Sequence, residues 1–182
     1  MTTYIALLRG INVSGHHKIK MAELKQLFLD LGYHDVSTYI QSGNVIFKSY
    51  IKEPILIEDT IISAISKHFG HAIKVLILTK NELTTIFNSN PFLAKDATID
   101  ISKLHVTILN KKPDLAEIQP IEILVANSND EFQLVENTIY LHCPNGYGNT
   151  KLNNNLFEKK LIATATTRNW KTISKLVELS NQ

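Results

Sequence analysis

The sequence predicts an α+β protein: a ferredoxin-like βαββαβ N-terminal subdomain plus a second, abbreviated α+β subdomain with two C-terminal helices. Three observations lead to this prediction. Residues 4–8 are five consecutive apolar residues, which is typical of a strand buried on both faces. Over residues 3–79, strand-like and helix-like patterns follow the order of the split βαβ unit. Part of that order then returns after residue 103.

Each element of the first subdomain, residues 1–79, has a local signal. Apolar residues recur at helical spacing in two stretches, and Gly32 and Gly70 follow them as helix stops. Gln41-Ser42-Gly43-Asn44 lies between two apolar runs and is typical of a tight hairpin turn. The predicted elements are a strand over 4–8, a helix over about 20–31, strands over 36–40 and 45–48, a helix over 54–69 and a strand over 73–78.

The rest of the chain divides into a connection, residues 80–102, and a second subdomain, residues 103–182. The connection is predicted as a helix over 80–90 followed by a loop over 91–102. Asn169 has the residue type and position of an N-cap for the last helix. The other predicted elements are a strand over 104–109, a short helix after Pro113, a further strand over 121–125, a hairpin of 132–135 and 138–142, a glycine-rich loop over 143–150, and an amphipathic helix behind it.

Composition excludes several classes of protein. With 44% hydrophobic and 20% charged residues, the chain resembles ordinary soluble domains, and its apolar runs are far shorter than the roughly 20 residues of a membrane helix. Residues 1–4 show no secretion signal, and Cys143 has no second cysteine to pair with. We therefore expect a cytoplasmic protein without membrane partners.

Positive charge is unevenly distributed. The formal net charge is only +2, but both ends of the chain are basic, whereas residues 113–137 carry six acids and no base. Two interpretations are open. The charged side chains face solvent without a specific role, or the two basic ends of the chain together form an anion-attracting surface. Support for nucleic acid binding is weak, because the central strands of the first subdomain offer few aromatic residues on which bases could stack.

Two arginines stand out, because 17 of the 19 basic residues are lysines. Arg9 follows the first strand, and Arg168 precedes the last helix. Arginine offers a planar fork of donors for a carboxylate or phosphate that lysine cannot copy. Lys151 lies near the start of the preceding helix, where a second cation could serve the same anion.

The predicted topology brings further polar residues together. In a split βαβ unit the exit of the first strand lies beside the entry of the third, so the stretch from Arg9 to Asn12 should adjoin the hairpin turn. We expect an anionic small molecule, nucleotide-like or a carboxylate, to bind in a cleft between the subdomains. The predicted ligand-binding residues are Arg9, Asn12, Gln41, Ser42, Asn44, Tyr147, Lys151 and Arg168.

The sequence lacks the residue patterns of several well-known kinds of functional site. The loop Gly10–Gly15 lacks the Gly-Lys-Ser/Thr ending of a phosphate-binding P-loop, and Ser42 is better suited to supporting its turn than to acting as a nucleophile. No histidine pair has a ligand-like partner, so neither a metal nor another cofactor is predicted. Whether the protein is an enzyme stays open.

The motifs also resemble a known family. These motifs are Tyr4–Val13, Tyr39–Val45, Asn90-Pro91-Phe92, Leu104–Thr107, Asn145–Lys151 and Ala165–Trp170. Together they resemble the bacterial domain-of-unknown-function family 1697, although Ser14 stands where that family more often has glycine. The resemblance implies two subdomains related to the ferredoxin-like unit and implies no reaction. The alternative to ligand binding is a non-enzymatic module that contacts protein or nucleic acid, as a monomer or a homodimer.

Overall fold

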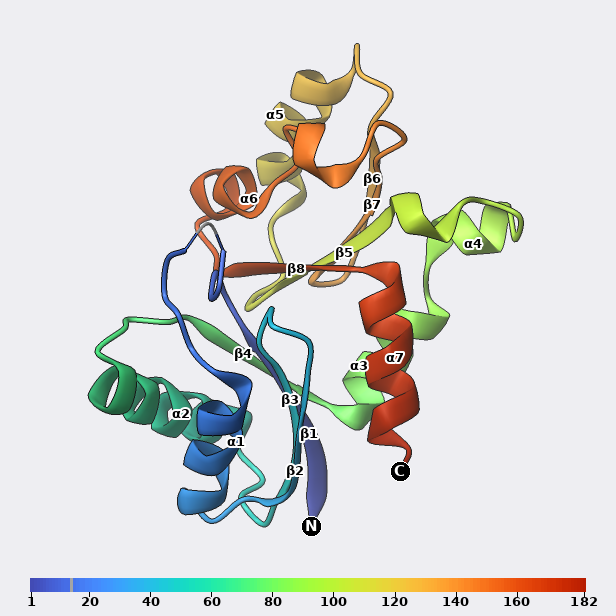
Figure 1. Ribbon diagram of the computed structural model, residues 1–182. Coiled ribbons are helices and arrows are strands. Elements are labelled where there is room, and N and C mark those ends of the chain that lie inside the picture. Colours follow the sequence, from blue (N-terminus) through green and yellow to red (C-terminus); the bar gives the residue numbers. More distant parts are fainter. Residues whose placement is uncertain (14) are drawn as a thin grey trace. The chain divides into compact units, whose positions relative to one another are not determined.

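The protein is described by a computed structural model covering residues 1–13 and 15–182 (Figure 1). Ser14, part of the predicted loop Gly10–Gly15, lies outside the described residues. The chain forms two compact units, one of residues Met1–Thr84 with Leu176–Gln182 and one of Thr85–Lys175. Within the described residues, no helix is long and apolar enough to cross a membrane.

The first unit has the predicted ferredoxin-like topology. Its strands form one antiparallel sheet in the order β2-β3-β1-β4, so that the first and third strands are the central pair. This confirms the fold class predicted from residues 3–79. The elements are β1 (Thr2–Leu8), α1 (Met21–Asp30), β2 (His34–Tyr39), β3 (Asn44–Ser49), α2 (Pro54–Phe69) and β4 (Val75–Thr79).

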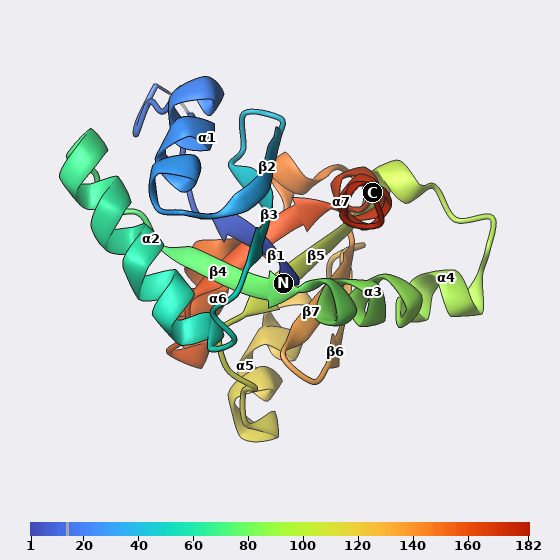
Figure 2. The same cartoon turned by 90° about the horizontal axis from the view of Figure 1, so that it is seen from below.

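Helices α1 and α2 cover one face of this sheet, as both views show (Figures 1 and 2). Tyr4, Ala6 and Leu8 alternate along β1 toward these helices and belong to their apolar core. Ile5 and Leu7, on the opposite face of the strand, are also fully buried. The continuous apolar run therefore marks a strand buried on both faces, as predicted.

Strand β2 forms one edge of the sheet and is irregular. Its register with β3 shifts between His34 and Ser37, and Asp35 within this interval has a φ of 49°. Lys48 of β3 forms an ion pair with the Asp35 carboxylate at 2.7 Å. The edge strand thus departs from regular pairing at a charged, exposed residue.

The second unit repeats the same topology in full. Its sheet has the order β6-β7-β5-β8, again antiparallel throughout, and α5 and α6 lie against each other (Figure 2). It is therefore not abbreviated. The remaining elements are α3 (Lys80–Asn88), α4 (Pro91–Lys95), a 3-10 turn (Ile101–Lys103), β5 (Leu104–Leu109), α5 (Leu115–Val125), β6 (Glu131–Val135), β7 (Thr138–His142), a 3-10 turn (Tyr147–Asn149), α6 (Asn154–Leu161), β8 (Ala165–Asn169) and α7 (Trp170–Ser180).

Strand β8 of the second unit was not predicted from the sequence. Its residues, 165–169, pair with His105–Leu109 of β5 over the full length of β8. Asn169 nevertheless caps α7 as predicted, because its Oδ1 accepts the backbone N–H of Thr172 at 2.8 Å.

Two other local predictions were wrong. Residues 121–125 form the end of α5 instead of a strand, because a capping box between Asp114 and Glu117 starts a helix that continues through them. The predicted loop over 91–102 contains α4. The Asn90 side chain accepts the backbone N–H of Phe92 at 3.0 Å and so starts this short helix.

Candidate functional site

In the first unit, the two predicted polar stretches do meet. The backbone N–H of Leu8 donates to Gly43 O at 2.8 Å, and Asn12 Nδ2 donates to Gln41 O at 2.9 Å. We call the predicted residues of this unit the rim: Arg9, Asn12, Gln41, Ser42 and Asn44. The proximity of the two stretches, predicted from the topology, is confirmed.

Asn12 is the main link within the rim. Its Nδ2 also donates to Ile19 O at 2.9 Å, and its Oδ1 accepts the backbone N–H of Ile19 at 2.9 Å. Asn12 has a φ of 55°, a conformation that asparagine tolerates better than most residues. One side chain therefore holds the two ends of a loop together and fastens both to the hairpin turn.

Asn44 supports the turn from inside. It is fully buried, and its Nδ2 donates to Tyr39 O at 2.9 Å and to Ser42 Oγ at 3.1 Å. Gly43 between them has a φ of 77°, and a Cβ there would lie 2.7 Å from Ile11 Cδ1. The rim amides of Asn12 and Asn44 thus make structural bonds to neighbouring backbone.

Arg168 and Tyr147 belong to the second unit. Arg168 is buried in β8, and its Nη1 donates to Thr167 O at 2.9 Å. The Tyr147 ring stacks on His105 with 4.7 Å between the ring centroids. Burial lowers the pKa of His105, partly opposed by a hydrogen bond with the backbone of Lys103, so the stacked imidazole is held toward its neutral form.

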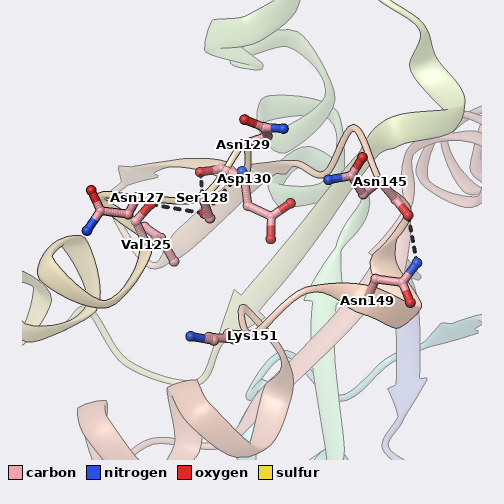
Figure 3. A pocket seen from close by; sticks show the side chains of 8 residues that line it. All are labelled: Val125, Asn127, Ser128, Asn129, Asp130, Asn145, Asn149 and Lys151. Carbon is pink, nitrogen blue, oxygen red and sulfur yellow. Dashed lines mark hydrogen bonds between the residues drawn. The ribbon is translucent and has the colours of Figure 1, made fainter.

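Lys151 lies in a polar pocket of about 320 Å³ that is contained in the second unit. Two loops form it: the loop between α5 and β6, and the loop between β7 and α6 (Figure 3). The lining side chains are mainly amides, with one hydroxyl, one carboxylate and one ammonium group. They are Val125, Asn127, Ser128, Asn129, Asp130, Asn145, Asn149 and Lys151.

Hydrogen bonds hold the two pocket loops in place. Thr150 Oγ1 donates to Asp130 Oδ2 at 2.6 Å and so joins one loop to the other. Within the second loop, Asn149 Nδ2 donates to Asn145 O at 2.8 Å (Figure 3). Because the walls of this pocket are already ordered, its polar groups can orient a small ligand without the entropic cost of ordering the loops.

The chain's cysteine lies next to these loops. Cys143 is fully buried, and burial, reinforced by the charge of Asp130, raises the pKa of its thiol to about 11; a side-chain hydrogen bond with Thr150 acts in the opposite direction. Because this exceeds the ordinary value of 9.0, the unfolded chain loses this proton first as pH rises. The thiol's contribution to stability therefore declines between about pH 9 and pH 11.

Across residues 1–13 and 15–182, no cluster of three or more His, Cys, Asp or Glu side chains could hold a metal ion.

Comparison with known proteins places the chain in a family. The family described as protein of unknown function (DUF1697) matches residues 1–140. The chain belongs to the DUF1697 family. A solved structure of a conserved bacterial protein from Streptococcus pneumoniae is similar, with a TM-score of 0.73 and 22% identity over 98% of each chain. That likeness concerns the fold, and no curated protein matches the chain.

The DUF1697 match covers only one of the pocket loops. Residues 127–130 lie within the matched part, whereas Asn145, Asn149 and Lys151 follow it. Of the pocket residues, only Lys151 was predicted from the sequence. A signal for four of the others was present: Asn127-Ser128-Asn129-Asp130 is an uninterrupted polar run between an apolar helix and a hairpin.

We expect Cys143 to be alkylated by iodoacetamide only after the chain unfolds. The thiolate is the reactive form, and a buried thiol with a pKa of about 11 supplies little of it near neutral pH. Mass spectrometry should find the folded protein unmodified after an exposure that labels the urea-unfolded chain completely. Equal labelling of both would contradict the burial of this side chain.

Proposed function

We propose that the pocket binds a small molecule that carries one anionic group, a phosphate or a carboxylate, together with several hydrogen-bonding groups. The observation that carries this proposal is the presence of one ammonium group, Lys151, in a cavity lined mainly by amides and a hydroxyl. The volume of about 320 Å³ lies at the lower end of the range for small-molecule sites.

The pocket side chains have distinct roles in this proposal. Lys151 contacts the anionic group through a charge-assisted hydrogen bond. Asn127, Asn129 and Asn145 each offer both donors and an acceptor, which suits hydroxyls, amines or the edge of a base. Asp130 disfavours a second anionic group nearby, so the ligand carries its charge at one end. Phosphorylated sugars and nucleotide-like compounds fit this description.

The other predicted ligand residues are structural in this proposal. Asn12 and Asn44 hold the first unit's hairpin turn through bonds to the backbone, and Arg168 is buried with a bond to the backbone of Thr167. These contacts support a structural assignment for Asn12, Asn44 and Arg168. A cytoplasmic location is part of the proposal and suits the free thiol of Cys143, because cytosolic thiols are kept reduced.

A thermal-shift screen tests the proposal. Inorganic phosphate, phosphosugars, nucleotides and carboxylic acids should include a compound that raises the melting temperature. At about 100 times its dissociation constant, a ligand adds roughly 2.7 kcal/mol of stability. If none of these classes stabilises the protein, the proposal fails.

Substitution of Lys151 by methionine should lower the affinity for a compound found in the screen by about ten- to a hundredfold. This is the contribution expected of one hydrogen bond to a charged group. Isothermal titration calorimetry measures the change. Lys160→Met is the matched control, because it removes the same charge from an exposed position of α6 that does not line the pocket. Unchanged affinity in Lys151→Met, or an equal loss in the control, would contradict the assignment.

A protein-interaction role is the second candidate. Leu115 and Ile123 of α5 are 81% and 70% exposed within the acidic stretch 113–137. Large exposed apolar side chains are common at contact surfaces. Concentration-dependent association in analytical ultracentrifugation, combined with a negative ligand screen, would favour this candidate over the first.

A further inference from the structure

The pocket loop contains a chemically labile dipeptide. Asn145-Gly146 is the only Asn-Gly pair in the sequence, and Asn145 is exposed at the pocket (Figure 3). In such a pair, the backbone nitrogen of the glycine can attack Cγ of the asparagine side chain. A nitrogen–carbon bond forms, ammonia leaves, and a cyclic succinimide results. Water then opens the ring and yields aspartate or isoaspartate.

The path of the loop requires the glycine. Gly146 has φ 89° and ψ 145°, a backbone conformation that is accessible essentially to glycine alone. A Cβ at this position would meet no atom of the described residues within 4 Å, so the requirement is conformational rather than steric. The fold therefore imposes the labile pair wherever asparagine occupies position 145.

In the folded loop, the backbone nitrogen of Gly146 is engaged in a hydrogen bond and is kept from attacking the Asn145 side chain. The N–H of Gly146 donates to Cys143 O at 2.9 Å, and this nitrogen is the atom that would attack. Asn149 also holds the carbonyl groups of both residues of the pair. Its Nδ2 donates to Asn145 O at 2.8 Å, and its backbone N–H donates to Gly146 O at 3.1 Å. Ring closure requires Gly146 N to leave Cys143 O and turn toward the Asn145 side chain.

We infer that Asn145 is a site of spontaneous deamidation whose rate is set by the opening of the turn from Cys143 to Asn149. The folded turn preserves the amide, and each opening event exposes it to cyclisation. The product places a new carboxylate in the loop that carries Lys151. Its effect on ligand binding rests on the proposed function, whereas the reaction itself does not.

Peptide mapping by mass spectrometry tests the inference. The purified chain is incubated in mildly alkaline buffer with and without urea, and aspartate plus isoaspartate at position 145 is quantified over time. Because the reaction needs local opening, we expect it to be more than about tenfold slower in the folded protein. Equal rates, or faster conversion in urea at Asn88 or Asn127, each of which precedes a serine, would overturn it.

A variant tests the role of the turn in the folded state. Asn149→Ala removes the side-chain bond to Asn145 O, so folded Asn149→Ala should deamidate several-fold faster than the parent chain. Asn129→Ala is the matched control, because Asn129 lines the same pocket from the other loop. If Asn149→Ala and Asn129→Ala both deamidate at the parent rate, the turn does not control the reaction.

The charge effect is measured separately with inorganic phosphate as the probe. Asn145→Asp reproduces the aspartate product and should bind phosphate more weakly than the parent chain. If deamidation occurs as expected but Asn145→Asp binds phosphate unchanged, the proposed anion site is contradicted and the modification site stands. If Asn145 does not deamidate in urea, the modification site fails regardless of phosphate binding.

Discussion

Gly43→Ala should lower the free energy of unfolding by about 2–4 kcal/mol, from the combined costs of a left-handed alanine and of overpacking. The new Cβ would lie 2.7 Å from Ile11 Cδ1 and 2.8 Å from Leu8 Cβ, and the backbone φ is 77°. Leu8 belongs to the central strand, so it cannot withdraw without disturbing the sheet. Urea unfolding followed by circular dichroism measures the change.

Gly32→Ala provides the matched control for this prediction. Gly32 has a similar φ of 81°, but a Cβ there would meet no atom of the described residues within 4 Å. It should therefore show only the conformational cost, about 1 kcal/mol. Similar losses for Gly43→Ala and Gly32→Ala would mean that the close approach of Gly43 to Leu8 and Ile11 has no energetic effect.

The second large effect is expected at Asn12. Asn12→Ala should reduce stability by about 3 kcal/mol, because it removes three hydrogen bonds and leaves alanine at a positive φ. The bonds are those from Nδ2 to Ile19 O and Gln41 O, and that from Ile19 N–H to Oδ1, each 2.9 Å long. Urea unfolding again provides the measurement.

Asn12→Asp separates the hydrogen bonds from the backbone conformation. Aspartate tolerates the same positive φ, but it loses both Nδ2 donors and places a charge against two carbonyl oxygens. We expect it to destabilise the fold as much as alanine does. A stable Asn12→Asp variant would show that Asn12 acts through its φ alone. Asn181→Ala, which removes one exposed bond to Val177 O, should change stability little.

Much of the first unit could be predicted because its signals are local and consistent. The apolar run of β1, the glycine after α2 and the turn around Gly43 each indicate one structure. In the second unit, β8 has the sequence Ala-Thr-Thr-Arg-Asn and lacks the apolar alternation of a strand. Its pairing with β5 depends on partners distant in the sequence, which local patterns do not contain.

The candidate site was less predictable than the fold. Arg168 was predicted as a ligand residue because arginine is rare in this chain, but the fold buries its side chain in a strand, where it bonds to the backbone. Residues 127–130, which line the pocket together with Lys151, come from a loop more than 20 positions earlier, and their proximity to Lys151 follows from the pairing of β6 with β7. Composition identifies such polar runs without showing which of them face one another.

The irregular edge strand β2 also bears on association between chains. An exposed sheet edge offers unpaired N–H and C=O groups to any other extended chain, including a partly unfolded copy. The register shift near Asp35, with its positive φ and its ion pair to Lys48, interrupts that row of groups. Another chain could form only a few backbone hydrogen bonds with β2 before reaching the irregular, charged position at Asp35. We therefore expect the register shift to hinder edge-to-edge association, so substitutions that restore regular pairing there should lower solubility.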